Sequence, residues 1–142
     1  MKKMAMFLGI TMMLAFFPVS LSSQQDELTA RCAGCFMSPY ITTGQAMKAF
    51  LTGDEVAEFH TSLYAGNIYR IAACSQEAGN IIFSVYDKNR RLLFDSKKTV
   101  NAEYWDFKVE GSLECIIEAR LNEQKLHSGV VLVMIGFKSL LN

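Results

Sequence analysis

The chain has 142 residues, about half of them hydrophobic, and its 14 basic and 14 acidic side chains give a net charge of zero. No long run of like charge is present, so nucleic acid and acidic membrane surfaces are not expected as partners. The length is that of a single domain, and no internal repeat or low-complexity segment divides it.

Residues 1–23 have the pattern of a secretory signal peptide. Lys2 and Lys3 precede an apolar run of 14 residues, 4–17, and small residues follow near Ser22. A transmembrane helix needs about 20 apolar residues, so this run is too short to be one. We therefore expect an exported protein, periplasmic or extracellular, with no membrane span once the signal is removed.

The remaining chain is predicted to consist of an N-terminal arm, residues 24–48, followed by a β-sandwich domain, residues 49–142. Residues 24–31 are polar and are expected to be loose. Residues 42–51 are ambiguous, because their apolar side chains suit either a short helix or an edge strand. The sequence alone does not choose between these two structures.

From Val56 onward, the apolar residues recur with a period of two, which is typical of half-buried β-strands. The strands are about 8–12 residues apart, and turn-forming residues separate them. Residues 130–138 are apolar on both faces and predict a central strand. Core-facing positions are predicted at Phe59, Thr61, Leu63, Tyr69, Ile71, Ala73, Trp105, Phe107, Val109, Leu113, Cys115, Ile117 and Ala119. The predicted fold is all-β, an antiparallel β-sandwich or jelly roll of about seven to eight strands.

Four cysteines, Cys32, Cys35, Cys74 and Cys115, are expected to form structural disulfides, because exported thiols tend to oxidise. Alternation places Cys115 toward the core and Cys74 outward at a strand end. A bridge between Cys74 and Cys115, with Cys32 and Cys35 bridged locally, is the preferred pairing. The alternative is a crossed pairing, in which Cys32 or Cys35 joins Cys74 and Cys115.

The C-x-x-C spacing of Cys32 and Cys35 also raises three chemical alternatives. Thioredoxin-type chemistry needs a strand before the first cysteine, and none is predicted there. Covalent haem attachment needs a histidine after the second cysteine, where this chain has Phe36. Structural zinc needs a second close pair of ligands, which is missing. A structural fastening is therefore favoured, and a periplasmic thiol–disulfide protein is kept as an alternative function.

The remaining polar residues do not predict a catalytic or metal site. His60 and His127 are expected to be exposed, and no G-x-S-x-G motif accompanies them. Acidic residues near Asp54 and Asp87 could bind calcium through oxygen, but solvated turns are the favoured interpretation. We expect no enzyme activity, no cofactor and no metal.

Three tyrosines, Tyr64, Tyr86 and Tyr104, are predicted on exposed faces and are the candidate ligand-binding residues. The predicted function is a non-catalytic binding or accessory module whose ligand is a protein or a glycan. A carbohydrate-binding module that uses these tyrosines is the other alternative, and the oligomeric state stays open.

The run from Phe50 to Cys74, with turns at Gly53-Asp54 and Ala65-Gly66 between alternating apolar residues, resembles the bacterial pre-peptidase C-terminal domain. Residues 81–96 resemble the next hairpin of that family, and the similarity extends over roughly residues 49–137. It implies a secreted β-sandwich that serves as a binding or accessory module, without catalytic residues. This chain lacks the paired acidic residues that many such modules carry at the start of the hairpin strand.

Overall fold

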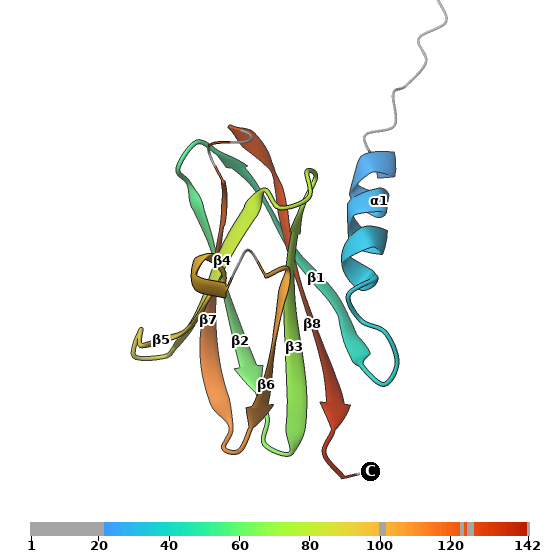
Figure 1. The fold of residues 1–142 in the computed structure, drawn as a ribbon, viewed down its shortest axis with the longest axis vertical. Coiled ribbons are helices and arrows are strands. Elements are labelled where there is room, and N and C mark those ends of the chain that lie inside the picture. Colours follow the sequence, from blue (N-terminus) through green and yellow to red (C-terminus); the bar gives the residue numbers. More distant parts are fainter. Residues whose placement is uncertain (1–21, 100–101, 123, 125–126, 142) are drawn as a thin grey trace, which may run out of the picture.

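A computed structural model describes residues 22–99, 102–122, 124 and 127–141, so the predicted signal peptide lies outside the described residues as far as residue 21. Within these ranges the chain forms one α-helix, a short 3-10 helix and eight β-strands (Figure 1). The elements are α1 (Ser22–Ala33), β1 (Ile41–Thr52), β2 (Val56–Leu63), β3 (Asn67–Ser75), β4 (Ile81–Asp87), β5 (Leu92–Asp95), η1 (Ser96–Thr99), β6 (Tyr104–Val109), β7 (Leu113–Leu121) and β8 (Ser128–Ser139).

The strands form two four-stranded sheets, ordered β1-β8-β3-β6 and β2-β7-β4-β5. Every pairing is antiparallel. Consecutive strands pass from one sheet to the other at every connection except the β4–β5 hairpin. This order is that of an eight-stranded jelly roll, so the predicted fold class is confirmed.

The core lies between the two sheets and is filled by alternate residues of each strand. The predicted inward-facing sets on β3, β6 and β7 all pack there: Tyr69, Ile71, Ala73, Trp105, Phe107, Val109, Leu113, Cys115, Ile117 and Ala119. β8 is central in its sheet, between β1 and β3, as its apolar character on both faces predicts.

The second face of β8 is buried because α1 covers it. Leu28 and Cys32 lie one helical turn apart and pack against Ala72, Leu132 and Met134 on the outer side of the sheet. In Figure 1, α1 lies beside β1 and β8. The prediction of a loose segment at residues 24–31 is therefore wrong. These residues belong to a helix whose two apolar side chains pack against an apolar sheet face. Within the described residues, no helix is both long and apolar enough to cross a membrane.

The ambiguous segment 42–51 belongs to β1, which begins at Ile41 and forms an edge of its sheet. Its pairing with β8 is interrupted between Thr42 and Ala46, where Gly44 adopts a φ of 78°. A left-handed backbone at a bulge is a position that glycine tolerates without strain. Bulges of this kind interrupt an edge strand and reduce its tendency to pair with other chains.

An arginine joins the α1–β1 connection to the outer side of β3. Arg70 makes two hydrogen bonds of 2.7 Å to the carboxylate of Asp106 on β6, and it donates to the carbonyl oxygen of Cys35 at 2.6 Å. Its guanidinium lies 4.2 Å from the ring centre of Tyr40 and 4.0 Å from that of Tyr104. The paired Asp106 carboxylate raises the pKa of Arg70 further, so this cation stays charged. The connection is thus held over the sheet by a charged, stacked side chain.

Candidate functional site

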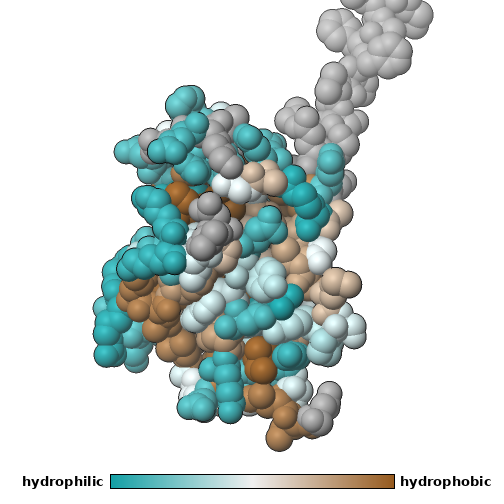
Figure 2. Space-filling view, in the orientation of Figure 1, coloured by the Kyte–Doolittle hydropathy of each residue, from teal (hydrophilic) through white to brown (hydrophobic). Residues whose placement is uncertain are grey.

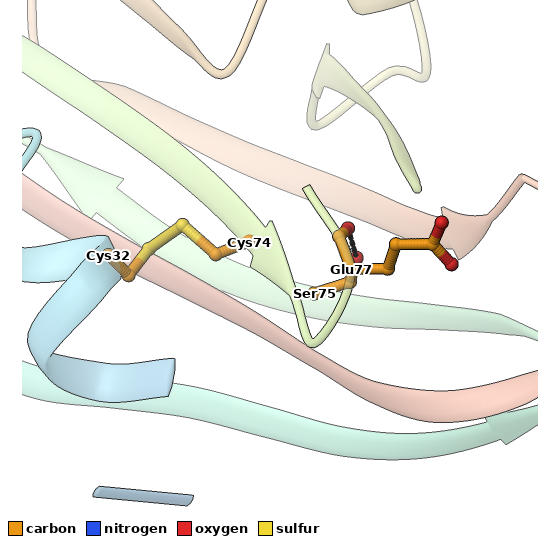
Figure 3. The surroundings of a disulfide bond; sticks show 4 residues. All are labelled: Cys32, Cys74, Ser75 and Glu77. Carbon is orange, nitrogen blue, oxygen red and sulfur yellow. Dashed lines mark hydrogen bonds between the residues drawn. A yellow bond between two sulfur atoms is a disulfide. The ribbon is translucent and has the colours of Figure 1, made fainter. Parts of the chain in front are cut away.

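The disulfide joins Cys32 of α1 to Cys74 of β3, with their Cα atoms 5.8 Å apart (Figure 3). Both predicted bridges, Cys74–Cys115 and Cys32–Cys35, are therefore wrong. The orientations of Cys74 and Cys115 were predicted correctly, and they explain the error. Cys74 lies on the outer side of its sheet beneath α1, whereas Cys115 faces the core from β7 in the other sheet. The crossed alternative is correct for Cys32–Cys74, but its second bond, between Cys35 and Cys115, is not formed.

Cys35 and Cys115 are free thiols, which corrects the prediction that all four cysteines are bridged. Burial, followed by the charge of Asp87, raises the pKa of Cys115 to about 11. Burial also raises the pKa of Cys35, and Glu103 adds to the rise while Arg70 opposes it. In this pairing, Cys32 and Cys35 do not form the C-x-x-C disulfide on which thioredoxin-type chemistry depends.

Concave parts of the described surface surround the end of β2. Three adjoining hollows, of about 430, 380 and 550 Å³, share Ser62 and Tyr64 in their walls. We call their combined lining the Tyr64 surface: Thr43, Met47, His60, Thr61, Ser62, Leu63, Tyr64, Asn67, Tyr69, Asp87, Lys88, Asn89, Arg91, Ser112, Leu113, Glu114, Cys115, Ile116, Ile135 and Phe137. It lies at the end of the sandwich where the β2–β3 and β6–β7 turns meet, at the bottom of Figure 1.

Tyr64 is exposed because β2 ends at Leu63, whose side chain is inward, so the next side chain points outward. Tyr64 is 64% exposed. Its backbone is nonetheless held on both sides: the Tyr64 N–H donates to the Tyr69 hydroxyl at 3.0 Å, and the Asn67 amide donates to the Tyr64 carbonyl at 3.5 Å. The following Gly66 has a φ of 90° and bonds to the backbone of Val109 and Leu140. The chain therefore presents an aromatic ring from a fixed turn.

The β4–β5 hairpin forms one wall of this surface. Lys88 and Glu114 each line two of the three hollows, so the surface carries charges of both signs. Figure 2 shows hydrophobic side chains on the side of this hairpin, where Leu92 and Leu93 are 44% and 40% exposed. The Tyr64 surface thus has charged groups in its walls and apolar side chains beside it.

Asp87 fixes the shape of this hairpin. One carboxylate oxygen accepts from the N–H groups of Asn89 and Arg91, both at 2.9 Å, and the other accepts from the Arg91 guanidinium at 3.0 Å. The N–H bond from Arg91 is the largest cause that lowers the pKa of Asp87. Arg90, with a φ of 60°, turns outward and pairs with Glu58 and Glu118. The Asp87 carboxylate thus stabilises the β4–β5 turn.

We expect the Asp87 carboxyl to titrate below its ordinary pKa of 3.8 in an NMR pH titration of the folded protein. Because the folded pKa is lowered, the carboxylate stabilises the hairpin above the ordinary pKa, and this contribution is lost as the pH falls through the folded pKa. The amide signals of Asn89 and Arg91 should shift with the same midpoint and should lose this transition in Asp87→Asn. A midpoint at or above 3.8 would contradict the assignment.

The three predicted tyrosines do not line a common hollow. Tyr86 projects from the outer side of β4, since Val85 beside it faces the core. Tyr104 lies on the outer side of the other sheet, stacked on Arg70. Only Tyr64 belongs to the concave surface, so the three rings do not form one flat platform for a sugar chain.

The histidines are placed as exposed residues. His60 pairs with Glu58 at 2.7 Å, and that contact, after the one from Arg90, lowers the pKa of Glu58. His127 is also exposed. In the ranges that the structure describes, no group of three or more His, Cys, Asp or Glu side chains is placed to hold a metal ion.

Two features escape sequence reasoning. Alternation puts Arg70 and Asp106 on outer faces, but only the β3–β6 register makes them opposite partners. The hollows around Tyr64 need the β4–β5 and β6–β7 turns to meet the end of β2, which is a long-range arrangement. From the sequence, alternation along β2 indicated only that Tyr64 is exposed.

No protein-family model matches the chain, and no curated protein sequence matches it. Among solved structures, the chain is similar to PliG from Aeromonas hydrophila, a periplasmic inhibitor of g-type lysozyme. The TM-score is 0.52 and the identity is 11%, over 72% of this chain and 91% of that chain. At this identity the likeness establishes a shared fold. The resemblance to pre-peptidase C-terminal domains stays a prediction.

Proposed function

We propose that this chain is an exported, non-catalytic module that binds a protein through the Tyr64 surface. One observation carries the proposal: a strongly exposed tyrosine stands on a hydrogen-bonded turn between three hollows. A tyrosine side chain has only two torsions to fix on binding and here stands on a fixed backbone, and aromatic residues are the usual anchors of protein interfaces.

Export to the periplasm or the cell exterior is supported by two independent features. Residues 1–23 have the signal-peptide pattern, and a disulfide joins Cys32 to Cys74. Disulfides persist in oxidising compartments such as the periplasm. The fold likeness to a periplasmic inhibitor agrees with this placement.

A protein ligand is favoured over a glycan. A flat sugar chain is usually held by several coplanar rings, whereas Tyr104 projects from the other sheet and Tyr86 does not line the hollows around Tyr64. The walls around Tyr64 combine apolar and charged groups of both signs, which suits a protein surface. The similar fold in PliG serves to bind an enzyme, and a g-type lysozyme is accordingly the first partner to test.

The test is inhibition of bacterial cell lysis by a g-type lysozyme, with binding measured by calorimetry. We expect the protein to slow lysis and Tyr64→Ala to weaken binding by about 30-fold, equivalent to about 2 kcal/mol. Phe50→Ala is the matched control, because Phe50 is a 66% exposed aromatic residue on β1, away from the Tyr64 surface.

The two possible failures are distinct. If the wild-type protein neither binds nor inhibits, the g-type lysozyme is not its partner. If it binds and Tyr64→Ala binds equally well, the Tyr64 surface is not the binding site. Both results would be read beside the unfolding curves of the variants, which should match the wild type.

A further inference from the structure

Three of the four cysteines lie where α1 ends against β3, in one apolar cluster. Cys32 is bonded to Cys74, and the Cys35 N–H donates to the Cys32 carbonyl at 3.1 Å. Cys35 and Cys74 also line the same small cavity, of about 60 Å³. A free cysteine therefore lines the same cavity as one of the two cysteines of the disulfide.

The position of Cys35 is held from outside the cysteine cluster. Its carbonyl accepts a 2.6 Å hydrogen bond from Arg70, which is itself fixed by Asp106. Arg70 and Cys74 lie on the same face of β3, because they are four residues apart on one strand. The half-buried Cys35 side chain packs on the same apolar cluster as Cys74. The backbone of Cys35 is thus fixed beside the apolar cluster that contains the disulfide.

We propose that Cys35 is an exchange thiol for this disulfide, so that Cys74 can pair with either Cys32 or Cys35. In the exchange, the Cys35 thiolate attacks the Cys74 sulfur, a Cys35–Cys74 bond forms, and the Cys32–Cys74 bond breaks. Cys32 leaves as a thiolate and takes up the proton that Cys35 released. One disulfide and one thiol are present before and after, so no oxidant or reductant is consumed.

The exchange changes how α1 is attached. In the observed pairing, the bond holds the last turn of the helix, where Cys32 is fully buried. With Cys35 bonded instead, the covalent attachment lies beyond Gly34, in the connection to β1. Without the Cys32–Cys74 bond, α1 would be kept on the sheet by the apolar contacts of Leu28 and Cys32 and by the hydrogen bond that Arg31 donates to the Gln76 carbonyl. The cysteine cluster is thereby a device that sets how firmly the N-terminal helix is fastened.

The test uses the full oxidised chain and a glutathione redox buffer at mildly alkaline pH. Free thiols are blocked with N-ethylmaleimide, and tryptic peptides are mapped by mass spectrometry. Cys32 and Cys35 share the peptide 32–48, while Cys74 lies in 71–88. In Cys32→Ser we expect a Cys35–Cys74 bond, and in Cys35→Ser we expect Cys32–Cys74 alone. Hydrogen exchange in residues 28–33 should be about tenfold faster in Cys32→Ser than in Cys35→Ser.

The wild type supplies a result that does not depend on how well a variant folds. Fragment ions should show both linkages, with alkylated Cys32 in the molecules that carry Cys35–Cys74. A wild-type map without detectable Cys35–Cys74, or Cys32→Ser protein that folds yet keeps Cys35 and Cys74 as thiols, would overturn the proposal.

Discussion

Cys74→Ser should lower the free energy of unfolding by about 4 kcal/mol, since the lost bond closes a separation of 42 residues. Cys74 is the partner in both pairings discussed above, so no other cysteine can replace it there. Urea unfolding, followed by the fluorescence of Trp105, measures the change. Trp105 is the chain's single tryptophan, stacked between Phe94 and Phe107 in the core.

Cys35→Ser is the matched control, because Cys35 takes no part in the observed disulfide. It should stay within about 0.5 kcal/mol of the wild type. Reduction of the wild type should bring its unfolding midpoint to that of Cys74→Ser. If Cys74→Ser were as stable as Cys35→Ser under oxidising conditions, the bond would not be what fastens α1 to β3.

Phe83→Ala should cost about 3–5 kcal/mol, the range for removing a buried aromatic ring. Phe83 is 1% exposed on β4, and its ring centre lies 5.1 Å from that of Phe94. Its N–H donates to the buried Ser96 hydroxyl of η1 at 3.0 Å, which ties this strand to the segment after β5. The cavity left by the ring would open between the two sheets.

Phe50→Ala removes the same ring from an exposed site and should change stability by about 0.5 kcal/mol or less. Both variants can be compared by thermal unfolding. A loss of under about 1 kcal/mol in Phe83→Ala would mean that β4 does not lie against the core as described.

Much of the fold could be predicted because it depends on local alternation. A period of two shows which side of a strand is buried, and it was correct for β3, β6 and β7. Alternation does not reveal which strands are neighbours. The orientations of Cys74 and Cys115 were therefore correct while their predicted bond was wrong, since the two residues lie on different sides of different sheets.

The helix was missed for a related reason. Its described apolar contacts come mainly from Leu28 and Cys32, too few for a clear helical period. The stronger signal lay elsewhere, in the apolar character of β8 on both faces. When both faces of a strand are apolar, a second element is expected to pack on its outer face. Here that element is α1.

The candidate site was predicted only in part. Parity identified Tyr64, Tyr86 and Tyr104 as outward residues, and Tyr64 indeed has an open environment. Strand order and the placement of the turns decide that the hollows surround Tyr64. They also decide that Tyr104 stacks on Arg70. These are long-range properties, which a local pattern does not encode.

The Cys32–Cys74 bond fastens the N-terminal helix to the jelly roll, and a disulfide map of the oxidised protein tests this attachment. We predict a main linkage between peptides 32–48 and 71–88, located at Cys32 by fragment ions, with Cys115 alkylated as a thiol. A main linkage between peptides 71–88 and 109–120, or a bridge within 32–48, would contradict it.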